Sequence, residues 1–129
     1  MADIELDGSG LLDIVKALDG AERQAANRAY EVVEKHAKEL RNEWRDNARD
    51  TARRHGRHYP KAITAEQIPA KDAVEWEVGP EEMREQGGMG RGFEYGGPRQ
   101  PPHLDGARAT VKVEPGFIAA LDEIARDLL

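Results

Sequence analysis

The chain contains no cysteine, so it can form neither a disulfide framework nor a thiolate metal site. It also has no apolar run approaching the roughly 20 residues that cross a bilayer. No basic segment followed by an apolar stretch opens the sequence, as a signal peptide would require. We therefore expect a protein without a membrane span or a signal peptide, made in a cytoplasm.

Aromatic residues are scarce at 5% and hydrophobic residues make up 39%, whereas charged residues reach 34%. An ordinary globular domain is less charged than this. The length of 129 residues fits a single domain over 1–129. Its core must be thin, built from aliphatic side chains around Trp44, Trp76, Phe93 and Phe117. Because such chains often gain stability by burying surface against copies of themselves, the composition favours self-assembly.

The net charge of −6 argues against a general nucleic-acid binder, which needs a cationic surface to neutralise phosphates. The charge is also unevenly spread. Residues 21–59 hold ten Lys or Arg and seven Asp or Glu, whereas the rest of the chain holds nine and eighteen. This division suits a subunit that presents different faces to different neighbours, and equally an ordinary basic helix on an acidic domain.

A long amphipathic helix is the clearest feature of the pattern, from about residue 21 to about Arg54. Apolar residues recur there at spacings of three and four: Ala26, Tyr30, Val33, Ala37, Leu40, Trp44 and Ala48. A helix of roughly 33 residues is about 50 Å long. That exceeds the usual diameter of a globule of this size, so we expect part of the helix to pack on another molecule.

Short alternating segments predict a small antiparallel sheet. Residues 3–7 alternate polar and apolar side chains, and 62–68 and 73–78 flank a proline-containing turn, as in a hairpin. A short helix is expected at 9–18, and a closing helix is expected to begin at Pro115. The predicted fold class is α+β, a small antiparallel sheet with the long N-terminal helix and a C-terminal helix packed on it.

A glycine-rich segment at 80–92 has four glycines and only Met83 and Met89 as apolar anchors. Ordering its backbone without burial would cost roughly 1–2 kcal/mol per residue. We therefore expect this flexible loop to be mobile in the isolated subunit and ordered in an assembly, where methionines adapt to a partner surface. Phe93 to Tyr95 is expected to form a short strand, and Thr110 to Val113 fits either a strand or a helix.

No pattern in the sequence indicates catalysis. His55 and His58 are too few for a zinc site, which needs three or four ligands, and a solvated helix end explains them better. The glycines at 87–92 lack the Lys-Ser/Thr ending of a phosphate-binding loop. We see no nucleophile–base pair, so we predict no enzymatic activity, no metal and no cofactor.

One basic patch runs along the long helix. Arg45, Arg49 and Arg53 lie four residues apart, so they stack on one helical face. Contact with DNA would reach only the phosphate backbone, because no base-reading side chain accompanies them. An acidic surface on a partner subunit explains the patch at least as well.

The tract from Ala73 to Leu104 combines three short motifs. A strand ends in Val78-Gly79-Pro80, Phe93-Glu94-Tyr95-Gly96-Gly97 follows after an insertion, and Pro101-Pro102-His103-Leu104 leads into the final helix. This tract resembles a family of phage tail-completion proteins, and so do the Gly-Leu-Leu at 10–12 and the long charged helix that follows. Many members carry a Thr-Gly-x-Leu element after that helix, which is missing here.

The resemblance implies a non-catalytic α+β subunit that forms a ring, with six copies expected, in the neck or tail of the virion. Connector or adaptor proteins and the tail-tube protein would be its partners, and DNA would pass through without specific binding. We expect the subunit contacts to involve Met83, Met89, Arg91, Phe93, Glu94, Tyr95, Gly96, Arg45, Arg49 and Arg53. The alternative is a small dimeric binding or adaptor module, associated with DNA through the basic face of the long helix.

Overall fold

The computed structural model describes residues 4–7, 22–71 and 73–128. The elements in chain order are β1 (Ile4–Asp7), α2 (Glu22–Ala52), α3 (Tyr59–Ala62), β2 (Ile63–Ile68), β3 (Glu75–Pro80), the 3-10 helix η1 (Gly87–Met89), α4 (Gly90–Tyr95) and α5 (Asp105–Asp127). The predicted α+β class is confirmed. The short helix expected at 9–18 lies outside the described residues.

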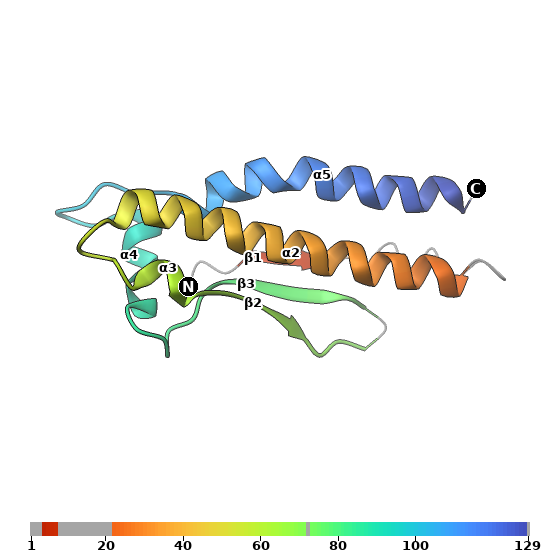
Figure 1. Cartoon of the computed structure of the whole chain (residues 1–129), viewed down its shortest axis with the longest axis horizontal. Coiled ribbons are helices and arrows are strands. Elements are labelled where there is room, and N and C mark those ends of the chain that lie inside the picture. The colour runs from red at the N-terminus through yellow and green to blue at the C-terminus, as the bar shows by residue number, and fades with distance from the viewer. Residues whose placement is uncertain (1–3, 8–21, 72, 129) are drawn as a thin grey trace.

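The elements form three layers, with the sheet on one side, α2 in the middle and α5 on the other side (Figure 1). The sheet has the order β1-β3-β2, and both pairs are antiparallel. The C-terminal helix packs mainly on α2 rather than directly on the sheet. One face of the sheet is therefore covered by α2, and the outer side of α5 faces away from the rest of the described chain.

Helix α2 buries one row of side chains along its whole length, because it lies between the two other layers. Its buried positions are spaced mostly four apart: Ala25, Ala29, Val33, Ala37, Leu40, Trp44, Ala48 and Ala52. The apolar row thus begins at Ala25 and Ala29, not at the predicted Ala26 and Tyr30, and Tyr30 is 42% exposed. Many of these side chains are alanines, whose small size lets both neighbouring layers approach closely.

The length of α2 does not require a second molecule, contrary to the sequence-based expectation. At 1.5 Å per residue its 31 residues span about 46 Å. Helix α5 runs beside α2 for most of this length, and the hairpin extends along its other side (Figure 1). The molecule is elongated, and a thin core spread along one long helix buries its apolar side chains within a single chain.

The hairpin of β2 and β3 confirms the predicted alternation. Trp76 and Val78 are buried toward α2, whereas Glu77 points to the other face. The register places Glu66 of β2 opposite Glu77, and the backbone of Glu5 in β1 pairs with Glu77 on the other side.

Helix α5 begins ten residues before the predicted start at Pro115. Thr110 to Val113 is helical, and Pro115 lies inside the helix. Proline in a helix interior leaves the carbonyl of the fourth preceding residue, here Val111, without its usual N–H donor. Both Val111 and Pro115 are exposed, so water can satisfy that carbonyl. None of the described helices is long and apolar enough to span a membrane.

Candidate assembly surface

The motif Phe93-Glu94-Tyr95 forms the last turn of helix α4, and the predicted strand is wrong. Successive residues of a helix point in directions about 100° apart, so Phe93 and Glu94 can both turn inward while Tyr95 turns outward. Phe93 is 3% exposed and Glu94 is 3% exposed, whereas Tyr95 is 60% exposed. The inner side of α4 is therefore packed against the rest of the chain, and its outer side exposes the aromatic ring of Tyr95.

Phe93 belongs to a small stack of rings. Its centroid lies 4.7 Å from that of Tyr59 and 5.5 Å from that of His103, with the His103 ring nearly parallel. The backbone N–H of His103 also donates to the carbonyl of Phe93 at 2.8 Å. Burial raises the pKa of the Tyr59 hydroxyl above its ordinary value of 10.0. Phe93 thus packs in the core, and only its edge reaches the groove beside α4 that is described below.

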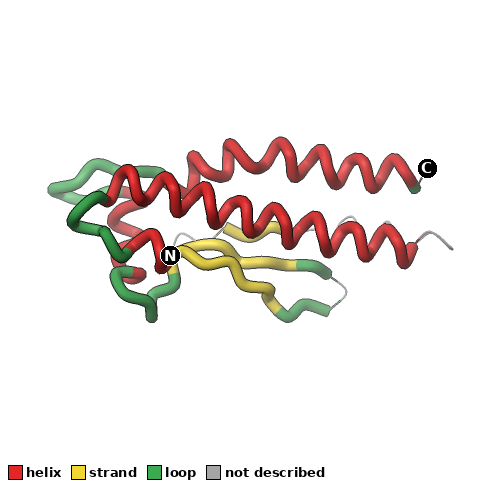
Figure 2. Tube along the Cα trace, in the orientation of Figure 1, coloured by secondary structure: helices red, strands yellow, loops and turns green. Residues whose placement is uncertain are grey.

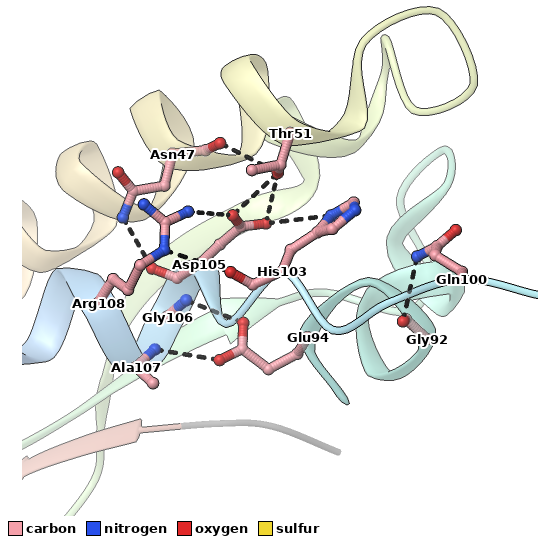
Figure 3. Close-up of polar contacts among 10 residues, drawn as sticks. All are labelled: Asn47, Thr51, Gly92, Glu94, Gln100, His103, Asp105, Gly106, Ala107 and Arg108. Carbon is pink, nitrogen blue, oxygen red and sulfur yellow. Dashed lines mark hydrogen bonds and ion pairs between the residues drawn. The ribbon is translucent and has the colours of Figure 1, made fainter. Parts of the chain in front are cut away.

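Glu94 caps the N-terminus of α5. Its two carboxylate oxygens accept hydrogen bonds from the backbone N–H groups of Gly106 at 2.9 Å and Ala107 at 3.0 Å (Figure 3). A negative charge is favourable there because the first N–H groups of a helix lack partners within the helix. Glu94 is therefore buried within the chain, which corrects its assignment as a contact residue.

The first residue of α5 is tied to α2 through a buried carboxylate. The hydroxyl of Thr51 donates to Oδ1 of Asp105 at 2.9 Å, and Nη2 of Arg108 donates to the same oxygen at 3.0 Å (Figure 3). Nδ2 of Asn47 donates to the Asp105 carbonyl at 2.9 Å. Burial raises the pKa of Asp105, although the Thr51 hydrogen bond opposes the shift.

These contacts join α4, the start of α5 and the C-terminal half of α2 into one rigid unit. Asp105 is 0% exposed and would be costly to bury without the groups that bond to it. The connections before and after α4 gather at this end of the molecule (Figure 2). A partner that binds at this end of the molecule would therefore contact a surface that is already ordered by these hydrogen bonds.

Two methionines that were predicted to make subunit contacts are exposed, as Tyr95 is. Met83 is 93% exposed and Met89 is 42% exposed. Arg91 is exposed as well. A shallow groove of about 390 Å³ lies beside α4 and is lined by Met89, Phe93, Gly92, Gly97, Pro98 and nearby residues. Exposed apolar groups next to a preformed groove are typical of a protein–protein contact.

The glycine-rich segment 80–92 is not a bare loop in the structure. It contains η1 and the start of α4, and Gly87 and Gly90 are buried. A Cβ on Gly90 would lie 2.5 Å from the Pro80 ring, so the absence of a side chain lets this turn pack against β3. Its flexibility in solution stays a prediction, now confined to the exposed turn around Met83.

Gly96 ends α4 with a φ of +80°, a conformation that side chains rarely adopt. A Cβ there would also lie 2.8 Å from the carbonyl oxygen of Gln100. Gly96 is therefore needed for the turn that follows α4 and does not itself provide a contact surface. Its role near the groove is to set the path of residues 97–100.

Two of the three arginines of the row on α2 bond to groups within the chain. Nε of Arg45 donates to the Ile63 carbonyl at 2.7 Å, and burial lowers the pKa of Arg45. Arg49 forms an ion pair with Asp46 at 2.7 Å. Arg53 lies just beyond α2 with a φ of +47°, so it leaves the helical face predicted for the row. Arg49 and Arg53 are exposed, so these two side chains can still reach a partner surface.

The described residues contain no group of three or more His, Asp or Glu side chains that could hold a metal ion. No known family, curated protein or solved structure matches the chain. The function is therefore inferred from this surface and from the resemblance of its motifs.

The contact between Asp105 and Thr51 was not predicted. Asp105-Gly106 after two prolines could have indicated a helix start, since acidic residues favour the first turn.

Proposed function

We propose that the chain is a structural subunit of the head–tail junction of a long-tailed bacteriophage, without catalytic activity. It would form a ring, with six copies expected, that joins or caps the tail tube in the virion neck or tail. Its partners would be its own copies, connector or adaptor proteins and the tail-tube protein. DNA would pass through the ring without specific binding.

The exposed Tyr95 is the observation that carries this proposal. An aromatic side chain that is 60% exposed, on a helix held from behind by Phe93 and Glu94, is a suitable anchor for a neighbouring subunit. Met89 and the groove beside α4 add exposed apolar area on the same short segment of the chain. The resemblance of residues 73–104 to tail-completion proteins supports the phage assignment, because the same segment provides this surface.

Electron microscopy and native mass spectrometry of the purified protein test the proposal. We expect rings of a single copy number for the unaltered protein. Tyr95→Ala should abolish the rings while leaving the helical circular dichroism signal intact, since Tyr95 contributes little to the core. Tyr30→Ala is the matched control, because Tyr30 is 42% exposed on α2 and should leave the rings unchanged.

Two results would count against the proposal. If Tyr95→Ala unfolds the subunit, Tyr95 has a structural role and the assigned surface is wrong. If neither variant alters assembly, the ring contact lies elsewhere. Genes for portal, capsid and tail-tube proteins beside this one would provide independent support for the phage assignment.

A further inference from the structure

Helix α5 carries a second apolar row on the side that faces away from α2. This outer row consists of residues spaced three and four apart: Leu104, Arg108, Val111, Pro115, Ile118 and Asp122. Residues at such spacings share one face of a helix. Val111 is 74% exposed, Ile118 is 48% exposed and Leu104, immediately before the helix, is 41% exposed.

The outer row lies opposite the contact that α5 makes with α2. The inner row includes Ala109, Val113, Phe117 and Ile124, all of them buried. Val111 is two positions from both Ala109 and Val113, which turns it about 200° away from each of them. Helix α5 is the outermost layer of the subunit, so no other described element covers the outer row (Figure 1).

Charge placement indicates what covers this row. Arg108 stands seven residues before Pro115, and Asp122 stands seven residues after it. A parallel copy of the helix would set Arg108 against Arg108. An antiparallel copy centred at Pro115 sets Arg108 against Asp122 twice and, within one residue or about 1.5 Å along the helix, Val111 against Ile118 twice. The row is therefore complementary to its own reversed copy, as a twofold contact requires.

We propose that the outer row of α5 binds the same row of a second copy, antiparallel, about a twofold axis at Pro115. Arg108 uses Nε and Nη2 within its own subunit, toward His103 and Asp105, and half of its side chain stays exposed. Asp122 is exposed. A twofold contact does not by itself close a ring of equally oriented subunits, so this surface is distinct from the one around Tyr95.

Disulfide trapping tests the register of the two antiparallel helices. Because the chain has no cysteine of its own, only the introduced cysteines can react. Val111→Cys and Ile118→Cys proteins, mixed and mildly oxidised, should form a mixed disulfide. Neither variant should form one alone, because equivalent Cα atoms would lie roughly 9–12 Å apart along the axis, beyond the usual disulfide range. Glu123→Cys mixed with Val111→Cys is the control and should stay uncoupled. A Val111→Cys self-disulfide, or no mixed disulfide at high concentration, overturns the proposal.

Sedimentation equilibrium provides a second test. Val111→Asp should weaken dimerisation on the order of tenfold, because it places a charge in the centre of an apolar contact. Glu114 lies beside the proposed axis and would face its own copy, so Glu114→Gln should strengthen the dimer. Unchanged association in both variants overturns the proposal. Tyr95→Ala should leave the dimer intact, which separates a failure of this contact from a failure of the ring.

Discussion

Gly106 shows how a single residue sets the distance between two helices. A Cβ at this position would lie 2.5 Å from the ring of Trp44, in a space that has no room for a methyl group. Trp44 is itself fully buried in the middle layer, so its ring cannot move into solvent. The start of α5 can approach α2 at this point because residue 106 lacks a side chain.

Gly106→Ala should consequently lower the free energy of unfolding by about 1–3 kcal/mol, the usual cost of overpacking a core. Thermal or urea denaturation would measure it. Gly92→Ala is the control, since Gly92 lies in α4 and a Cβ added there would have nothing within 4 Å. That variant should be neutral or slightly stabilising, because alanine favours a helix. Equal stability of the two variants would contradict the account of Gly106.

Asp105 should make stability depend on pH in the acid range. Its pKa is raised above 3.8 by burial, so the unfolded chain loses this proton at a lower pH than the folded chain does. The folded state then binds more protons between the two values, and this residue's contribution to stability falls as pH rises through that window. Above the folded pKa the loss is complete.

Asp105→Asn isolates that contribution from those of the other carboxyl groups. The stability of the variant minus that of the unaltered protein should rise as pH increases from below 3.8 through the folded pKa. Urea denaturation at a series of pH values would measure this difference. A difference that stays constant with pH would show that Asp105 has an ordinary pKa, despite its burial.

Among the elements, those with long or strictly alternating patterns were predictable from sequence. Helix α2 and the β2–β3 hairpin were found because their apolar positions repeat many times. The sequence predicts a strand where the short helix α4 lies. Three residues fit both the two-residue period of a strand and the 3.6-residue period of a helix, and the glycines before them suggest a loop. The early part of α5 was missed because Pro115 resembles a first-turn proline and Val111 and Val113 favour strands.

The candidate surface was predicted only in part, for a similar reason. Tyr95, Met83 and Met89 are exposed as a contact surface requires. Phe93 and Glu94 were assigned to the same surface, because sequence spacing alone does not tell which side of a short helix is covered. Their burial depends on contacts with Tyr59, His103 and the α5 N-terminus, distant in sequence.

Hydrogen exchange should separate the two halves of the segment 80–95. Amides of α4 should be protected in the isolated subunit, because α4 is bonded to the start of α5. Amides around Met83 should exchange quickly there and slow down on assembly, when a partner covers the exposed turn. Equal exchange around Met83 in the free and assembled protein would show that this turn takes no part in the contact.

At the scale of the whole molecule, the negative net charge disfavours binding to nucleic acid. The net charge is −6, and Arg45 and Arg49 of the basic patch already bond to groups within the chain. We expect weak binding to duplex DNA at physiological salt in a gel-shift or fluorescence assay. Tight binding that resists added salt would contradict the ring proposal and favour the DNA-associated module.

The central position of α2 also imposes an order on folding during synthesis. All three strands and α2 precede α5 in the chain, so the ribosome releases them first. Until α5 follows, the side of α2 that it covers faces water, with Trp44 among the residues laid open. During synthesis, the apolar side of α2 that α5 later covers is therefore exposed for a time. A chaperone that recognises apolar surface would bind the chain at this stage.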